Sequence, residues 1–269
     1  MSGCGQTAVS YDNPYDVYAT TADLGLSGTG ECVEQTYFSD NLCVIDDTNI
    51  GTDGTHSNVA EGAGVFNLAT GTVNYAQNIY EKLYPASTTK ILTAYLALKY
   101  GNLDDLVTVS EYAAKQASDS SVCGLKAGDV VSLRDLLYGM MLKSGNDAAI
   151  AIAEHLSGSV EAFADLMNQE ANAMGATRSH FVNPNGLPDE DHYTSVYDLY
   201  LIFQNAVKDD RFVDIISTMS YDTSYTDASG NPVEKTWENT NQYLVGKETP
   251  PDGITVVGGK TGTTGAAGY

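Results

Sequence analysis

The order of hydrophobic periodicities along the chain constrains its fold more than any other feature. Short β-branched or alternating segments stand near both ends, and helical patterning fills the middle from Ser87 to about residue 210. A period of two is typical of strands, and a period near 3.6 is typical of helices. This order predicts an α/β (α+β) fold in which an antiparallel sheet comes from both chain ends and a helical lobe, about residues 102–210, is inserted.

The strand signals are short but recognisable. Residues 62–78 form two apolar runs around a tight Ala69-Thr70-Gly71 turn, which predicts a β-hairpin. From Phe212 onward we expect strands again, with a turn at Gly230-Asn231. The segments that we read as single strands are 41–46 (NLCVID), 106–110 (LVTVS), 221–227 (YDTSYTD) and the late run that begins at 254 (ITVVGGKTG).

The helix signals are stronger. One helix is expected from Ser87 to Gly101-Asn102, where the glycine ends it. Ser132 and Ser159 stand before amphipathic runs and are expected to cap them. Further helices are expected from near Glu111, after an interruption at residues 143–146, and over 195–209.

Charge and composition exclude several functions. Lys plus Arg number 13 and Asp plus Glu number 35, so the net charge is −22, which excludes nucleic acid as a partner. No apolar run reaches the 18 residues of a transmembrane helix. Four scattered cysteines and four unpaired histidines give no metal site, and we expect each histidine to be a surface or packing residue.

The first 40 residues are rich in Gly, Ser, Thr, Asp and Tyr and are interpreted as an extended leader before a domain at 41–269. Ser2-Gly3-Cys4 resembles the end of a bacterial lipoprotein cleavage box, but an accidental cysteine explains it as well. Cys32 and Cys43 could close a small disulfide loop in an oxidising compartment.

Three short motifs carry the chemistry: Ser87-x-x-Lys90, Ser144-Gly145-Asn146 and Lys260-Thr261-Gly262-Thr263. Each alone has an ordinary structural explanation as a helix cap with a solvated lysine, a turn, or the end of a strand. Together they occur in a fixed order, each on its expected element: a helix start, an inter-helix turn and a late strand.

The residue types of the motifs suit acyl transfer. Lys90, one turn after Ser87 and near Lys260, can lose its proton when desolvated and act as a base on the serine. Ser144 can relay a proton, and Asn146 can orient Lys90 and bind a substrate amide. Thr261 and Thr263, beside Gly262, offer hydroxyls to a substrate carboxylate, and the backbone N–H of Ser87 contributes to an oxyanion hole.

These motifs resemble the penicillin-binding-protein and serine β-lactamase superfamily, and most of all its D-alanyl-D-alanine carboxypeptidases. The resemblance runs from about Ala63 to Tyr269 and includes PASTTKILTAYLAL, SGNDAAIAIAEHLSGS and GGKTGTTGAAGY. It implies a β-lactamase/transpeptidase-like fold and an enzyme of the cell envelope, either lipid-anchored through Cys4 or secreted. Ser87 would attack the D-Ala-D-Ala bond of a peptidoglycan stem peptide and would be acylated by β-lactam antibiotics, without a cofactor.

Departures from the family pattern leave alternatives open. The second motif is S-G-N and no E-x-x-L-N follows, which favours a carboxypeptidase over a class A β-lactamase. A β-lactamase, a DD-endopeptidase and a non-catalytic penicillin-binding fragment remain alternatives. Only nine residues follow Lys260, where the family has two more strands and a helix. We expect the chain alone to be marginally stable and poorly active, and a complementing C-terminal segment to restore activity.

Overall fold

The computed structural model describes residues 42–51, 57, 59–265 and 267. Within these, the elements in chain order are β1 (Ala63–Asn67), β2 (Thr72–Gln77), η1 (Ala86–Thr89), α1 (Lys90–Tyr100), β3 (Leu106–Thr108), α2 (Glu111–Ala114), β4 (Val130–Ser132), α3 (Leu133–Leu142), α4 (Asn146–Ser157), α5 (Val160–Ala173), α6 (Val196–Ala206), α7 (Asp210–Ser217), β5 (Ser220–Thr226) and β6 (Pro232–Glu238). This is a mixed fold of helices and antiparallel sheets, as the periodicities predicted.

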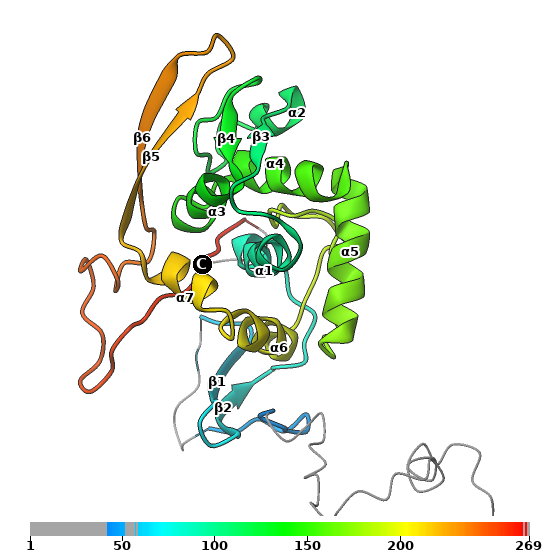
Figure 1. The fold of residues 1–269 in the computed structure, drawn as a ribbon. Helices are drawn as coiled ribbons and strands as arrows, with labels where there is room; N and C mark the ends of the chain where they lie inside the picture. The colour runs from blue at the N-terminus through cyan, green and yellow to red at the C-terminus, as the bar shows by residue number, and fades with distance from the viewer. Residues whose placement is uncertain (1–41, 52–56, 58, 266, 268–269) are drawn as a thin grey trace, which may run out of the picture. The chain divides into compact units, whose positions relative to one another are not determined.

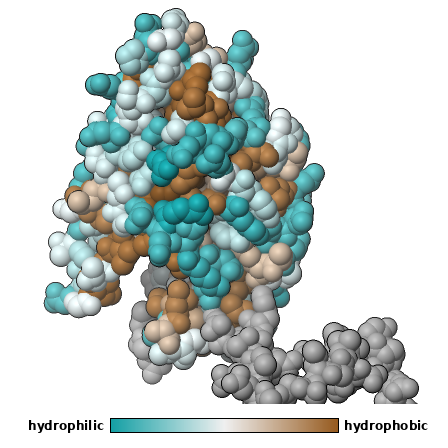
Figure 2. Space-filling view, viewed as in Figure 1, coloured by the Kyte–Doolittle hydropathy of each residue, from teal (hydrophilic) through white to brown (hydrophobic). Residues whose placement is uncertain are grey.

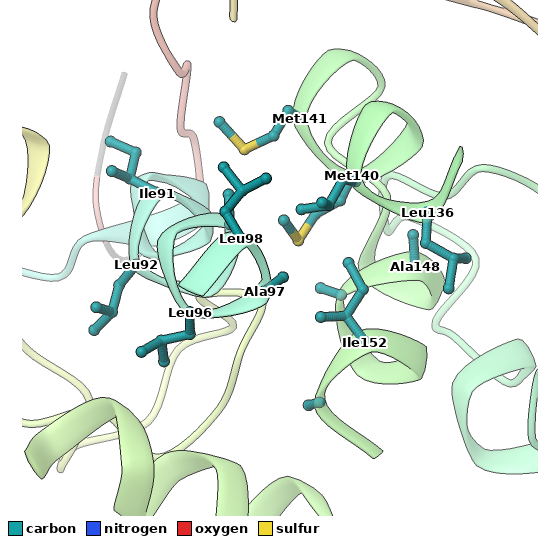
Figure 3. Packing of buried hydrophobic residues seen from close by; sticks show 14 of the residues in the cluster. Ile91, Leu92, Leu96, Ala97, Leu98, Leu136, Met140, Met141, Ala148 and Ile152 are labelled. Carbon is teal, nitrogen blue, oxygen red and sulfur yellow. The ribbon is translucent and has the colours of Figure 1, made fainter. Parts of the chain in front are cut away.

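Helix α1 lies at the centre of the fold, with α3 to α7 around it (Figure 1). Its apolar side chains face the neighbouring helices, and Figure 3 shows residues of α1 turned toward Met140 of α3 and Ile152 of α4. Leu92 and Leu96 are almost completely buried. Full burial of one such side chain contributes about 1.5–3 kcal/mol, so α1 is held mainly by its surroundings. The position of its first turn is therefore set by the core.

Serine caps begin most of the surrounding helices. The side chains of Ser110, Ser132, Ser159 and Ser195 each accept a hydrogen bond from the backbone N–H three residues later. Such a bond satisfies one of the orphan donors of a helix N-terminus. The predictions of capping by Ser132 and Ser159 are confirmed.

The strands form two sheets rather than one sheet from both chain ends. β1 and β2 pair as the predicted hairpin, while the second sheet has the order β3-β4-β5-β6. In that sheet β3 pairs along β4, β4 joins β5 only at Val130 and Thr226, and β5 pairs with β6 over their whole length. Figure 1 shows the β5–β6 hairpin extending beyond the helices. The hairpin turn at Gly230, with its positive φ, was predicted from the sequence.

Three strand predictions were wrong. Residues 42–46 form no strand because their backbone bonds to side chains: the Cys43 N–H donates to the Tyr200 hydroxyl, and the Cys43 carbonyl accepts from Tyr197. Residues 210–217 form α7, whose apolar side chains Phe212, Ile215 and Ile216 are buried on one face. Residues 254–263 have no regular secondary structure and pair with no strand among the described residues.

Of the cysteines for which we made predictions, only Cys43 lies among the described residues. Cys43 is a free, buried thiol, and Cys32 and Cys4 lie outside the described residues. None of the described helices has both the length and the apolar character needed to cross a bilayer. On the face seen in Figure 2, apolar side chains lie in separate groups among hydrophilic ones.

Candidate active site

Ser87 and Lys90 meet at the start of the central helix. Ser87 lies in the 3₁₀ turn η1, and Lys90 is the first residue of α1. The Lys90 Nζ atom is 3.0 Å from the Ser87 Oγ atom. Lys90 is completely buried, whereas Ser87 is half-buried. A buried amine thus stands behind a serine that solvent can reach.

The other two partners of Lys90 determine the direction of its lone pair. Its Nζ donates to Asn146 Oδ1 at 2.8 Å and to the Asn185 carbonyl at 2.7 Å. Both oxygens act here as acceptors, so they take the two N–H bonds of a neutral amine. In the structure the third bond of the Lys90 Nζ atom goes to the Ser87 Oγ atom. When the amine is neutral, the other two oxygens keep its N–H bonds, and its lone pair is left for the Ser87 hydroxyl.

Burial lowers the pKa of Lys90 well below its ordinary value, and the nearby positive charge of Lys260 lowers it further. Removal from water disfavours the charged form of an amine, and so does a neighbouring charge of the same sign. Both effects favour the neutral form that a base requires.

The Ser144-Gly145-Asn146 motif is a tight turn between α3 and α4. Ser144 has a positive φ of 62°, which is uncommon for a residue with a side chain. A Cβ atom at Gly145 would lie 2.3 Å from the Cys123 Sγ atom, so a larger residue there would require the Cys123 side chain to move. This turn directs Asn146 toward Lys90 and holds Ser144 within reach of the third motif.

Lys260 reaches Ser144 from the C-terminal segment. Its Nζ donates to Ser144 Oγ at 3.1 Å and to the Thr261 carbonyl at 2.6 Å. Desolvation lowers the pKa of Lys260 to about 8. The three motifs are therefore joined in one network through the Lys90–Asn146 and Lys260–Ser144 bonds.

The remaining residues of the third motif lie in different surroundings. Gly262 passes so close to η1 that a Cβ atom there would lie 3.1 Å from the Ser87 nitrogen. Thr263 is exposed and faces the cleft. The Thr261 hydroxyl instead forms a 2.8 Å hydrogen bond with the hydroxyl of Thr240.

A cleft of about 340 Å³ opens over Ser87. Its lining residues are Ser87, Asp119, Ser120, Ser121, Asn146, Asn185, Gly186, Leu187, Pro188, Thr263, Thr264 and Gly265. The wall thus comes from the two helix starts, the loop before β4, the loop before α6 and the C-terminal segment. Among the described residues, no group of three His, Cys, Asp or Glu side chains could hold a metal ion.

Sequence reasoning missed the part played by the loop at residues 184–188. The Asn185 carbonyl binds Lys90, and the Pro184 carbonyl accepts from Thr93 at 2.7 Å. Gly186 has a φ of 85°, and a Cβ atom there would lie 1.8 Å from the Ala86 carbonyl oxygen. Backbone carbonyls leave no mark on a sequence, but the Asn-Pro-Asn-Gly run was a visible signal of a tight turn.

Two buried polar side chains beside the motifs were also missed. His192 contacts the hydroxyl of Thr89 at 2.9 Å and accepts from the Val182 N–H, so it ties the loop to the turn before Lys90. Asp147, directly after Asn146, accepts from the backbone N–H groups of residues 123 to 125. Burial lowers the pKa of His192 to about 4, so it is neutral at ordinary pH.

The chain is similar to known proteins of one family. The sequence model described as D-alanyl-D-alanine carboxypeptidase matches residues 52–269. The chain belongs to the D-alanyl-D-alanine carboxypeptidase family.

Several relatives of the family are similar over most of the described chain. It is 36% identical over 216 residues to the D-alanyl-D-alanine carboxypeptidase DacF of Bacillus subtilis, which covers 78% of this chain and 52% of the relative. It is 35% identical over 198 residues to a D-alanyl-D-alanine carboxypeptidase of a Streptomyces strain, covering 69% of this chain and 67% of the relative. The chain spans about half the length of most of the curated relatives it matches.

Solved structures of the family have the same fold. The Streptomyces DD-transpeptidase superposes with a TM-score of 0.73 at 30% identity, over 81% of this chain and 85% of that one. A penicillin-binding protein homolog from Mycobacterium tuberculosis gives a TM-score of 0.69 at 28% identity, over 81% and 78% of the two chains. The expectation of a transpeptidase-like fold is therefore confirmed.

Proposed function

We propose that the chain is a serine-type carboxypeptidase that removes the terminal D-alanine from peptidoglycan stem peptides through an acyl-enzyme on Ser87. The observation that carries the proposal is the arrangement of Lys90. Its two N–H bonds are taken by Asn146 and the Asn185 carbonyl, so its lone pair faces the Ser87 hydroxyl 3.0 Å away. A positioned amine of lowered pKa is the base that activates a serine nucleophile.

Acylation begins when Lys90 takes the proton of the Ser87 hydroxyl. The Ser87 oxygen attacks the carbonyl carbon between the two D-alanines, and the carbonyl oxygen becomes an oxyanion. The Ser87 N–H and a backbone N–H beside Thr263 stabilise this charge. When the C–N bond breaks, the leaving nitrogen of D-alanine takes the proton that Lys90 removed from Ser87, passed on through the hydroxyl of Ser144, which is bonded to Lys260. Lys90 is then neutral again.

The substrate's terminal carboxylate is assigned to the side of the cleft formed by the third motif. Lys260 supplies positive charge there, and Thr263 supplies an exposed hydroxyl. In the present state the Thr261 hydroxyl is bonded to Thr240, so this residue would have to exchange that partner to bind a carboxylate. Asn146 uses Oδ1 for Lys90, which leaves its amide N–H groups for a substrate carbonyl.

Deacylation returns the enzyme to its starting state. Water adds to the ester carbonyl, Lys90 accepts the proton of the water, and the Ser87 oxygen leaves and recovers a proton. β-Lactams would acylate the same serine by opening of their ring, and a slow second step would trap the enzyme.

The substrate class implies a place outside the cytoplasm, in the cell envelope. Attachment through a lipid on Cys4 and secretion are the two routes that the sequence suggested, and Cys4 lies outside the described residues. The division into a leader at 1–40 and a catalytic domain at 41–269, with a helical lobe at about 102–210, likewise remains a proposal.

Two measurements on the 269-residue chain test the proposal. Incubation with benzylpenicillin should add one acyl group, and peptide mapping should place it on Ser87. Diacetyl-L-lysyl-D-alanyl-D-alanine should release free D-alanine. Ser87→Ala should lose both activities, while Ser229→Ala, an exposed serine in the β5–β6 turn, should retain both.

The outcomes separate the alternatives. Rapid turnover of a chromogenic cephalosporin without D-alanine release would favour a β-lactamase. Cleavage of cross-linked peptides alone would favour an endopeptidase. Acylation without release of D-alanine would leave a penicillin-binding protein without carboxypeptidase activity. No acylation at all, in protein that circular dichroism shows to be folded, would refute the assignment of Ser87.

A further inference from the structure

The cleft over Ser87 is lined by one ionisable side chain among the described residues, that of Asp119. The other lining residues present hydroxyl groups, amides, glycines and apolar side chains. Lys90 and Lys260 stand behind this lining, bonded to Ser87 and Ser144. A ligand in the cleft therefore meets a single carboxylate, and the mechanism above does not use it.

Asp119 lies in a loop that backbone hydrogen bonds hold in place. The Ser120 N–H donates to the Ala117 carbonyl at 3.0 Å, which closes a turn with Asp119 inside it. The Ser121 carbonyl then accepts from the Asn146 N–H at 2.9 Å. Farther along, the backbone N–H groups of residues 123 to 125 donate to Asp147. The turn is thus fixed to the start of α4 and keeps its place beside the cleft.

The carboxylate of Asp119 is available to a ligand. Asp119 is exposed, and within the described part of the chain it has no hydrogen-bond or ion-pair partner. An ordinary surface carboxylate would also be exposed and unpaired. What distinguishes Asp119 is its position on the wall of the cleft that holds Ser87.

In the proposed orientation of the substrate, the side chain of one substrate residue lies near Asp119. The terminal carboxylate lies toward Lys260 and Thr263, and the reacting carbonyl lies over Ser87. The residue before the two D-alanines must then follow Asn146, whose backbone N–H is bonded to the loop of Asp119. Stem peptides carry a diamino acid at this point, and its side chain ends in an amine.

We infer that Asp119 is a specificity-determining residue that binds the free amine of this diamino acid. The inference rests on the proposed function and assigns a substrate preference to the same cleft. A carboxylate and an ammonium group form a charge-assisted hydrogen bond, which discriminates against a substrate whose amine is blocked.

Two peptides that differ only at this amine test the inference. We compare Nα-acetyl-L-lysyl-D-alanyl-D-alanine, which has a free ε-amine, with its Nα,Nε-diacetyl form and measure D-alanine release. An ion pair at a partly exposed site supports a preference for the free amine of about threefold to tenfold in kcat/KM. In Asp119→Asn the ratio of the two kcat/KM values should fall to about one.

A matched control separates a local contact from the field of the whole acidic protein. Asp165→Asn removes the same charge from an exposed position on α5, and it should keep the full preference. Raising the salt concentration should reduce the preference of the unaltered protein, since screening weakens an exposed pair.

The possible results separate the inference from the proposed function. A ratio near one in the unaltered protein, or a preference that survives Asp119→Asn, would overturn the inference and leave the carboxypeptidase proposal intact. Equal loss of preference in Asp165→Asn would assign it to the overall charge instead. If neither peptide releases D-alanine, the proposed function itself is wrong and the inference with it.

Discussion

Of the side chains in and beside the site, Asp147 should cause the largest loss of folding stability when it is removed. It is almost completely buried and accepts a hydrogen bond from the Ala148 N–H at 2.9 Å and from three loop amides, those of Cys123 at 2.8 Å, Gly124 at 2.9 Å and Leu125 at 3.0 Å. Asp147→Ala deletes the acceptor for all three amides. It also leaves a space where the carboxylate stood, at the base of the loop that lines the cleft.

The magnitude follows from the number of buried donors. A hydrogen bond to a charged group contributes about 1.5–3 kcal/mol, and the amides of Cys123 and Leu125 are fully buried. Counting these two, and allowing the loop to relax, we expect the free energy of unfolding to fall by about 3–5 kcal/mol. For a domain of this size this corresponds to a loss of about 6–20 °C in Tm.

Thermal and urea unfolding, followed by circular dichroism, measure the change. Asp165→Ala is the control, because Asp165 is exposed on α5, and it should alter the free energy of unfolding by no more than about 0.5 kcal/mol. A stability of Asp147→Ala within 1 kcal/mol of the unaltered protein would refute the reasoning. It would mean that water or a rearranged loop satisfies the three amides at little cost.

Three further predictions concern the site itself. The acylation rate with benzylpenicillin should decline above about pH 8, because Lys260 loses its charge there; a rate that keeps rising to pH 10 would contradict the proposed role of that cation. Gly186→Ala should be poorly folded and not acylated. The new Cβ atom would lie 1.8 Å from the Ala86 carbonyl oxygen, and the φ of 85° is unfavourable for alanine. Normal stability of this variant would argue against the close approach. Ser144→Gly should keep its stability within about 1 kcal/mol, because glycine accepts the φ of 62°, yet lose about 10²-fold in acylation rate; unchanged acylation, measured by stopped flow, would remove Ser144 from the proton relay.

Local patterns predicted the helices and the first hairpin well. A helix requires only its own periodicity and caps, and Ser132 and Ser159 stood where caps are needed. The missed helix α7 had the same signal, since Phe212, Ile215 and Ile216 are spaced for one helical face.

Sheet pairing could not be predicted in the same way, because it depends on which partners are brought together. Residues 42–46 have strand composition, but the hydroxyls of Tyr197 and Tyr200 take the backbone groups of Cys43. The sequence also predicted Lys90, Ser144 and Lys260 in one site, and the structure bonds Lys90 to Asn146 and Lys260 to Ser144. It gave no sign of the Asn185 carbonyl, which needs tertiary structure to reach Lys90.

Residues 254–263 pair with no strand among the described residues, and this affects how the cleft responds to ligands. Among the described residues, contacts such as Lys260 with Ser144 and Thr240 with Thr261 hold this stretch in place, without a neighbouring strand along it. Backbone amides outside a helix or sheet open at low free energy and exchange with solvent readily. An acyl group on Ser87 that engages this stretch would add bonds which the free protein lacks. Inhibitor binding would then slow deuterium uptake in this segment. The ordering of the segment would also lower the net affinity, because it costs conformational entropy.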